Sequence, residues 1–85
     1  MYSVSFKKSA IKGLRRMPRR ISGRMLDELE QIAADPKTYS GDWKKLIGSR
    51  YWRLRIGGYR AVCDLRDDEL VLLVIKAGPR GDIYK

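Results

Sequence analysis

Residues 50–65, RYWRLRIGGYRAVCDL, contain two alternating segments separated by a pair of glycines. In the first segment apolar side chains occupy every second position, and Tyr51, Arg53 and Arg55 lie between them. A strand places alternate side chains on opposite faces, and a Gly-Gly pair permits the positive backbone angles of a two-residue turn. The stretch therefore predicts an antiparallel hairpin with one apolar face and one cationic face.

Two further segments complete the expected sheet. Residues 2–6, YSVSF, alternate apolar and small polar side chains, which is typical of a half-buried strand. Residues 70–78, LVLLVIKAG, are apolar on both faces, as in a central strand. The second strand of the hairpin leads into this last strand through the polar turn RDDE.

Between the first strand and the hairpin, apolar residues recur at helical spacing. A short helix begins near Lys7 and carries its basic residues mostly away from its apolar stripe. Pro18 separates it from a second helix, because proline supplies no amide to a helix interior. The second helix extends to Ala34, and Asp35 and Pro36 end it. The stripes consist of Ala10, Ile11, Leu14 and Met17 in the first helix and Ile21, Met25, Leu29, Ile32 and Ala33 in the second.

The segment after the second helix is expected to be a loop, in which Trp43, Leu46 and Ile47 contact the core and Lys44 and Lys45 are exposed. The order strand, helix, helix, strand, strand, strand predicts an α+β fold. Its sheet is twisted and mainly antiparallel, with both helices on one face. With 85 residues, 44% of them hydrophobic, the whole chain forms a single domain, 1–85.

The charge of the chain favours an anionic partner. The formal net charge is +9, and the first 26 residues hold eight Lys or Arg and no Asp or Glu. Such a field concentrates polyanions near the surface and speeds association with them. Nucleic acid and an acidic protein are the two partners it indicates. A role in solubility alone is the simpler alternative.

Cysteine and histidine usage excludes several kinds of chemistry. Cys63 is the only cysteine, so neither an internal disulfide nor a thiolate metal cluster can form. We expect it to fill space in the core. With no histidine, the usual zinc sites and the Ser-His-Asp arrangement are excluded, and we expect no metal or cofactor. No signal peptide or membrane-spanning run is apparent, which indicates a cytoplasmic protein.

The cationic face of the hairpin has two interpretations. Arginine presents a planar fork that fits phosphate oxygens, and the rings of Tyr51 and Tyr59 can stack on unpaired bases. The simpler interpretation is a solvated face of an amphipathic hairpin. The end of the chain, KAGPRGDIYK, favours the first, because a Gly-Pro break is followed by Arg80 and Tyr84 rather than by a polar tail. Asp64 and Asp82 are expected to be structural partners of arginines.

Several segments together resemble a known family. YSVSFKKSAIKGLRRMP, the Asp-Pro after the second helix, YWRLRIGGYRAVCDL and the closing R-G-D-I-Y are similar, in order, to the RelE toxins within the RelE/ParE superfamily of toxin-antitoxin modules. The resemblance covers essentially the whole chain. It implies a ribosome-dependent mRNA endoribonuclease that cleaves the codon in the A site without a metal.

The resemblance also implies roles for individual residues. Arg60 matches the catalytic arginine, Arg80 a second arginine at the scissile phosphate and Tyr84 the C-terminal tyrosine. Arg53 and Tyr51 stand where the best-studied members have lysines. The group that takes the proton is therefore left open among Tyr84, Tyr51, Lys85, and ordered RNA or water. Arginine itself is unsuited to that step because its guanidinium keeps its proton. The remaining expected RNA contacts are Arg55, Lys44, Lys45 and Lys85.

The implied reaction is attack of a 2′-hydroxyl on the adjacent phosphorus, which leaves a 2′,3′-cyclic phosphate and a 5′-hydroxyl. The implied partners are the ribosome, mRNA and an acidic antitoxin of the RelB type, with no membrane and with a monomeric free toxin. Two alternatives stay open: a ParE-like inhibitor of DNA gyrase that shares the fold, and a basic RNA-binding or ribosome-binding module without catalysis.

Overall fold

A computed structural model describes residues 1–79, in which two helices and five strands follow one another. Their order is β1 (Ser3–Phe6), α1 (Lys8–Arg16), α2 (Arg19–Ala34), β2 (Trp43–Lys45), β3 (Trp52–Ile56), β4 (Tyr59–Arg66) and β5 (Val71–Pro79). The strands form one sheet in the order β1-β5-β4-β3-β2. Only the β1–β5 pair of these strands is parallel. The predicted α+β fold with a mainly antiparallel sheet is confirmed.

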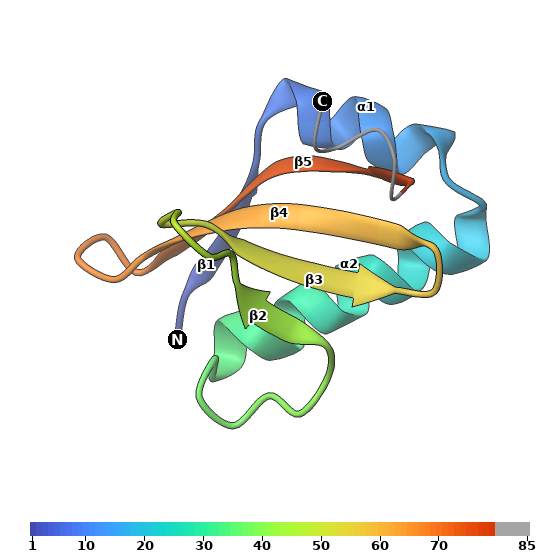
Figure 1. Ribbon diagram of the computed structural model, residues 1–85. Coiled ribbons are helices and arrows are strands. Elements are labelled where there is room, and N and C mark those ends of the chain that lie inside the picture. Colours follow the sequence, from blue (N-terminus) through green and yellow to red (C-terminus); the bar gives the residue numbers. More distant parts are fainter. Residues whose placement is uncertain (80–85) are drawn as a thin grey trace.

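The helices end where the sequence predicted. The carbonyl oxygen of Pro18 accepts hydrogen bonds from the amides of Ile21 and Ser22, over 2.9 and 3.0 Å, so Pro18 caps the start of α2. Asp35 caps its other end, immediately before Pro36. Figure 1 shows α1 running along β5 and α2 crossing behind the sheet. Among residues 1–79 there is no helix that is both long and apolar enough to cross a membrane.

The hydrophobic core lies between the helices and one face of the sheet. Leu29 of α2 and Leu54 of β3 are completely buried, and full burial of such a side chain stabilises the fold by about 2 kcal/mol. Trp43 and Trp52 stack at the border of the core, with ring centroids 5.1 Å apart. Other buried members of the core are Ala10, Met17, Met25, Ile32, Ala33, Ile56, Ala61, Cys63, Leu72, Val74 and Ala77.

The segment between α2 and β3 differs from the expectation of a loop. Trp43, Lys44 and Lys45 form the short edge strand β2, which pairs with Leu54, Arg53 and Trp52. Trp43 contacts the core as predicted, and both lysines are exposed as predicted. The prediction for Ile47 was wrong, because its side chain is fully exposed. It lies in the turn that follows β2.

A β-bulge interrupts the pairing of β4 with β5. Cys63 is opposite Val74, whereas Val62 is opposite Lys76, so Ile75 is an extra residue on β5. The hydroxyl of Ser9 in α1 donates a hydrogen bond of 2.6 Å to the carbonyl oxygen of Ile75. The bulge shifts the alternation of β5 by one residue. As a result Lys76 shares a face with Val62, and Ala77 enters the core.

Candidate functional site

The face of the sheet opposite the core carries two adjacent rows of basic side chains. Residues directly opposite each other on antiparallel strands project to the same side. One row runs across four strands as Lys44, Arg53, Val62 and Lys76. The next row consists of Arg55, Arg60 and Gly78. We call the five cations of these rows the cationic face.

Arg53 and Arg55 share one carboxylate. Asp42, just before β2, accepts a hydrogen bond from Arg53 Nη2 over 3.0 Å at Oδ1 and from Arg55 Nε over 2.6 Å at Oδ2. The carbonyl oxygen of Asp42 also accepts a bond of 3.0 Å from the Arg55 amide. Partial burial raises the pKa of Asp42, but the two arginines outweigh it and hold this pKa below its ordinary value. Asp42 therefore stays ionised and fixes both guanidinium groups.

Because of this ion pair, Arg53 is more buried than the sequence pattern predicts. Alternation correctly assigns it to the same face as Arg55, but the Arg53 residue is only 8% exposed, whereas Arg55 is exposed. A buried guanidinium is stable only with an anionic partner, and Asp42 supplies it. Arg55 thus presents its charge to solvent, while the charge of Arg53 acts from beneath the surface.

On the face of the sheet opposite the core, Asp64 is a structural partner of arginines, as the sequence predicted. Asp64 of β4 is buried and accepts hydrogen bonds from Arg50 over 3.2 Å and from Arg66 over 3.1 Å. These contacts connect the segment before β3 to the end of β4. Asp64 therefore neutralises two cations beside the cationic face and leaves the five cations of that face unchanged.

Arg60 and the two tyrosines of the hairpin occupy different environments. Arg60 is half-buried on β4, directly opposite Arg55. Tyr51, just before β3, is 38% exposed and accessible to a ligand. Tyr59 pairs with Ile56 and packs against the core. The expectation that Tyr59 offers a ring for base stacking was wrong, because the two-residue turn at Gly57, whose φ is 58°, places Tyr59 on the apolar side.

Two site residues were not found by sequence reasoning. Lys76 lies in an otherwise apolar strand, where simple alternation assigns it to the core face, and only the bulge at Ile75 brings it to the cationic face. Asp42 lies in a segment without a clear pattern, and its role depends on pairing with β3. Three residues of the expected site, Arg80, Tyr84 and Lys85, lie outside the described residues, as does Asp82.

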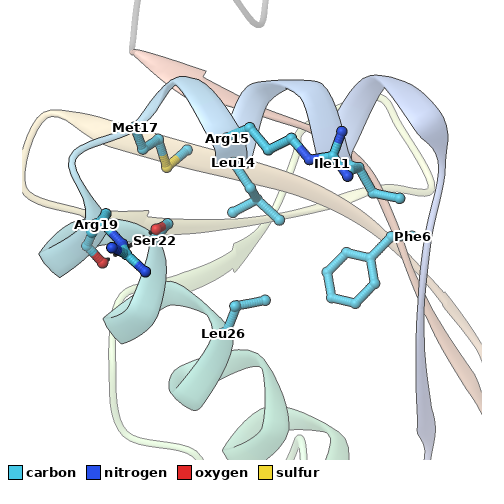
Figure 2. Close-up of a pocket in the computed structure, with 8 residues that line it drawn as sticks. All are labelled: Phe6, Ile11, Leu14, Arg15, Met17, Arg19, Ser22 and Leu26. Carbon is cyan, nitrogen blue, oxygen red and sulfur yellow. Dashed lines mark hydrogen bonds between the residues drawn. The ribbon is translucent and has the colours of Figure 1, made fainter.

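An apolar groove of about 510 Å³ lies between α1 and α2, away from the cationic face. Figure 2 shows Phe6, Leu14 and Leu26 around its interior, with Arg15 and Arg19 at its border. Ile11 and Leu26 are partly exposed, at 36% and 42%. The groove thus combines an apolar surface with a cationic border, in contrast to the polar face of the sheet.

Comparison with known proteins identifies the family. Residues 4–84 match the family model described as the ParE toxin of the type II toxin-antitoxin system parDE. The chain belongs to this family. The predicted membership of the RelE/ParE superfamily is confirmed.

Relatives of this ParE-family toxin include a RelE-like toxin protein of Escherichia coli, 25% identical over 98% of this chain and 90% of the relative. Among solved structures, the archaeal RelE-RelB complex from Pyrococcus horikoshii has 27% identity and a TM-score of 0.79, covering 95% of this chain and 97% of the other. The RelB-RelE complex from Methanococcus jannaschii has 26% identity and a TM-score of 0.78, with 94% of each chain covered. The intact E. coli RelBE complex has 23% identity and a TM-score of 0.79, over 93% and 96%, and matches the toxin in its fold.

Proposed function

We propose that this toxin is a metal-independent endoribonuclease that cuts messenger RNA in the ribosomal A site. The observation that supports it is the cationic face, where Arg55 and Arg60 lie opposite each other and Arg53 and Lys76 lie in the neighbouring row. The guanidinium groups of Arg55 and Arg60 can bind the oxygens of one phosphate, and the charges of Lys76 and of the buried Arg53 add to the positive field around it.

The proposed reaction is an internal transesterification. The 2′-oxygen of the ribose attacks the adjacent phosphorus, the bond from phosphorus to the 5′-oxygen breaks, and the products are a 2′,3′-cyclic phosphate and a 5′-hydroxyl. Negative charge develops on the phosphorane oxygens, and Arg60 together with Arg80 stabilises it. Preorganised cations of this kind contribute about 3 kcal/mol each to lowering the barrier.

Removal of the 2′ proton requires a group other than arginine. Asp42 is unsuited, because its lowered pKa and its two arginine partners make it a weak base. We assign the role to Tyr84, with Tyr51 and Lys85 as the alternatives. A tyrosine, whose ordinary pKa is about 10, becomes a usable base only when nearby cations lower that value. Arg53, held by Asp42, contributes its charge to this field from its buried position.

We also propose an acidic antitoxin as the partner of the free, monomeric toxin. Solved relatives are complexes of RelE with RelB, and a net charge of +9 favours fast, salt-sensitive association with an acidic chain. The groove between α1 and α2 offers such a chain an apolar surface bordered by Arg15 and Arg19.

The decisive experiment removes the nucleophile from the RNA. Ribosomes are programmed with an mRNA that the toxin cuts, and the ribose at the cleaved position is replaced by 2′-deoxyribose. Cleavage should stop while binding persists, because phosphate and stacking contacts supply most of the affinity. Arg60→Ala should reduce cleavage of the normal message by about a hundredfold or more, whereas Arg20→Ala should not. Cleavage of the deoxy substrate, or a 3′-hydroxyl product, would contradict the mechanism.

The second candidate function is inhibition of DNA gyrase, which the match to the ParE family model favours. It requires no RNA cleavage. Supercoiling by purified gyrase, measured with and without the toxin, distinguishes the two: inhibition without any mRNA cleavage would replace the ribonuclease proposal. Absence of both activities would indicate a basic binding module.

A further inference from the structure

We infer that a hollow between α1 and the end of β5 binds the phosphodiester group adjacent to the one that reacts at Arg60. The inference rests on the proposed ribonuclease function and extends its site across the edge of the sheet. The hollow has a volume of about 270 Å³. Its walls are Ser9, Lys12, Gly13 and Arg16 from α1 and the end of β5 from Lys76 to Pro79.

The walls of the hollow are held together by two close contacts. Gly13 brings the helix backbone against Ala77, where a β-carbon would lie 1.7 Å from the carbonyl oxygen. The Ser9 hydroxyl binds the carbonyl oxygen of the bulge residue Ile75. These contacts fix α1 beside the bulge, so the side chains around the hollow project from backbone that is already in place.

Three cations line the hollow, and they are available to a ligand. Lys12, Arg16 and Lys76 are all exposed. Within residues 1–79, no carboxylate lies within ion-pair distance of any of them. Lys12 and Arg16 are also four residues apart on one helix, where like charges repel and destabilise the helix. A bound anion between them removes that repulsion.

The hollow continues the cationic face. Gly78, which lines the hollow, is directly opposite Arg60, and Lys76 is two residues from Gly78 on the same strand. Diagonal neighbours on a sheet are about 7–8 Å apart, within reach of long side chains. One RNA strand can therefore place one phosphate at Arg60 and the next at Lys76, with Lys12 and Arg16 on its far side.

The character of the hollow favours nucleic acid over a protein segment. Its described lining consists of three cations, a serine, two glycines and the small apolar residues Ala77 and Pro79, with no aromatic ring and no leucine, isoleucine or methionine. An amphipathic protein segment buries more apolar surface in the groove between α1 and α2, which contains Phe6, Leu14 and Leu26. A phosphodiester needs charge and hydrogen-bond donors, which the hollow offers.

The test uses the full-length protein and a short single-stranded RNA whose 2′-hydroxyl groups are methylated, so that it binds but cannot react. Affinity is measured by fluorescence anisotropy over a series of salt concentrations. The variants are Lys76→Gln, and Lys12→Gln combined with Arg16→Gln. For each cation removed, the slope of log K against log salt should fall by about 0.7. Lys76→Arg should keep the slope, because it keeps the charge.

The matched control is Arg20→Gln combined with Lys37→Gln, which removes two exposed cations outside the hollow. An equal loss of affinity in this control would mean that only the overall charge matters and would overturn the inference. Failure of the unchanged protein to bind the methylated RNA would overturn it as well. The inference would also be overturned if the hollow variants kept their RNA affinity and lost affinity for an acidic antitoxin peptide. The hollow would then be a protein-binding site.

The subsite and the proposed function fail separately. In the ribosome assay, the Lys12→Gln and Arg16→Gln double variant should raise KM and leave kcat unchanged, whereas Arg60→Ala lowers kcat. If the hollow variants show the smaller slope of log K against log salt but the unchanged protein cuts no message, the result supports the RNA subsite and contradicts the ribonuclease. If the hollow variants keep the slope of the unchanged protein and cleavage depends on Arg60, the result contradicts the subsite and supports the ribonuclease.

Discussion

The backbone of Gly13 in α1 lies directly against the carbonyl oxygen of Ala77 in β5, so close that a β-carbon at position 13 would be 1.7 Å from that oxygen. Real β-carbons never approach backbone this closely, so either α1 or β5 would have to move. The position of α1 beside the sheet therefore depends on the absence of a side chain at one residue.

We predict that Gly13→Ala lowers the free energy of unfolding by at least about 2 kcal/mol, since backbone cannot yield as a flexible side chain does. Gly23→Ala is the matched control, because nothing lies within 4 Å of its new β-carbon in α2. That variant should gain about 0.5–1 kcal/mol from helix propensity. Urea unfolding followed by circular dichroism measures both changes. Equal stability of the two variants would contradict the close contact.

Asp42→Asn should destabilise the fold by about 2 kcal/mol, because it leaves the buried charge of Arg53 without its anionic partner. The pKa of Asp42 is lowered in the folded protein, so its stabilisation is present at neutral pH and is lost as pH falls through that pKa. The stability difference between the unchanged protein and the variant should therefore shrink as pH falls below the ordinary range of an aspartate. Asp27→Asn, at an exposed position of α2, serves as the control. A difference that stays constant with pH would show that the carboxylate charge plays no part.

Tyr39 should ionise only well above the ordinary range of a tyrosine. Burial, then its hydrogen bond to Glu28 and the charge of that carboxylate, raises its pKa well above the ordinary 10.0. In an alkaline titration followed by ultraviolet absorbance, Tyr39→Phe should lose an ionisation step that lies above the ordinary tyrosine range.

The stability effect of Tyr39 should depend on pH in two directions. A raised tyrosine pKa gives stability that is complete below pH 10 and is lost as pH rises through the folded value. The pKa of Glu28 is lowered, mainly by the same hydrogen bond, so that contribution is lost as pH falls through its folded value. The deficit of Tyr39→Phe, about 1.5 kcal/mol at neutral pH, should shrink at both extremes. A deficit that persists at both would contradict the pairing.

Cys63 should be unreactive in the folded protein. It is completely buried, and burial raises the pKa of its thiol to about 12, so almost no thiolate is present at neutral pH. Its reaction with an aromatic disulfide reagent should follow the unfolding of the chain and accelerate with urea as stability falls. Reaction at the rate of an unfolded thiol in buffer alone would contradict this burial.

Local patterns predicted the elements that carry their own signals. The alternation of Trp52, Leu54 and Ile56 and the glycine pair determined the β3–β4 hairpin, and Pro18 and Pro36 determined where helices begin and end. Asp64 and Cys63 also have the structural roles expected of them. In each case the sequence itself contains the signal: an alternation, a glycine pair, a proline, a carboxylate in an arginine-rich chain or a lone cysteine among apolar residues.

The features that escaped prediction depend on contacts between distant segments. The three residues of β2 form a strand only because β3 lies beside them. Asp42 pairs with Arg53 and Arg55 across that same edge. Lys76 reaches the cationic face through a bulge whose extra carbonyl is bound by Ser9 in α1. These partners meet only through strand pairing or helix packing, which no periodicity or turn signal in the sequence indicates.

The parallel pairing of β1 with β5 joins segments that lie far apart in the sequence, so we expect it to be the last strand pairing of the sheet to form. Ser9 and Ile75, which join the two ends of the described chain, are 66 residues apart, and contacts of such separation form late because the loop between them must close first. The β3–β4 hairpin, by contrast, can form from neighbouring residues alone. A nascent chain that has not yet made β5 lacks Lys76, the bulge and the partner of β1. The cationic face is therefore completed only when synthesis has passed β5.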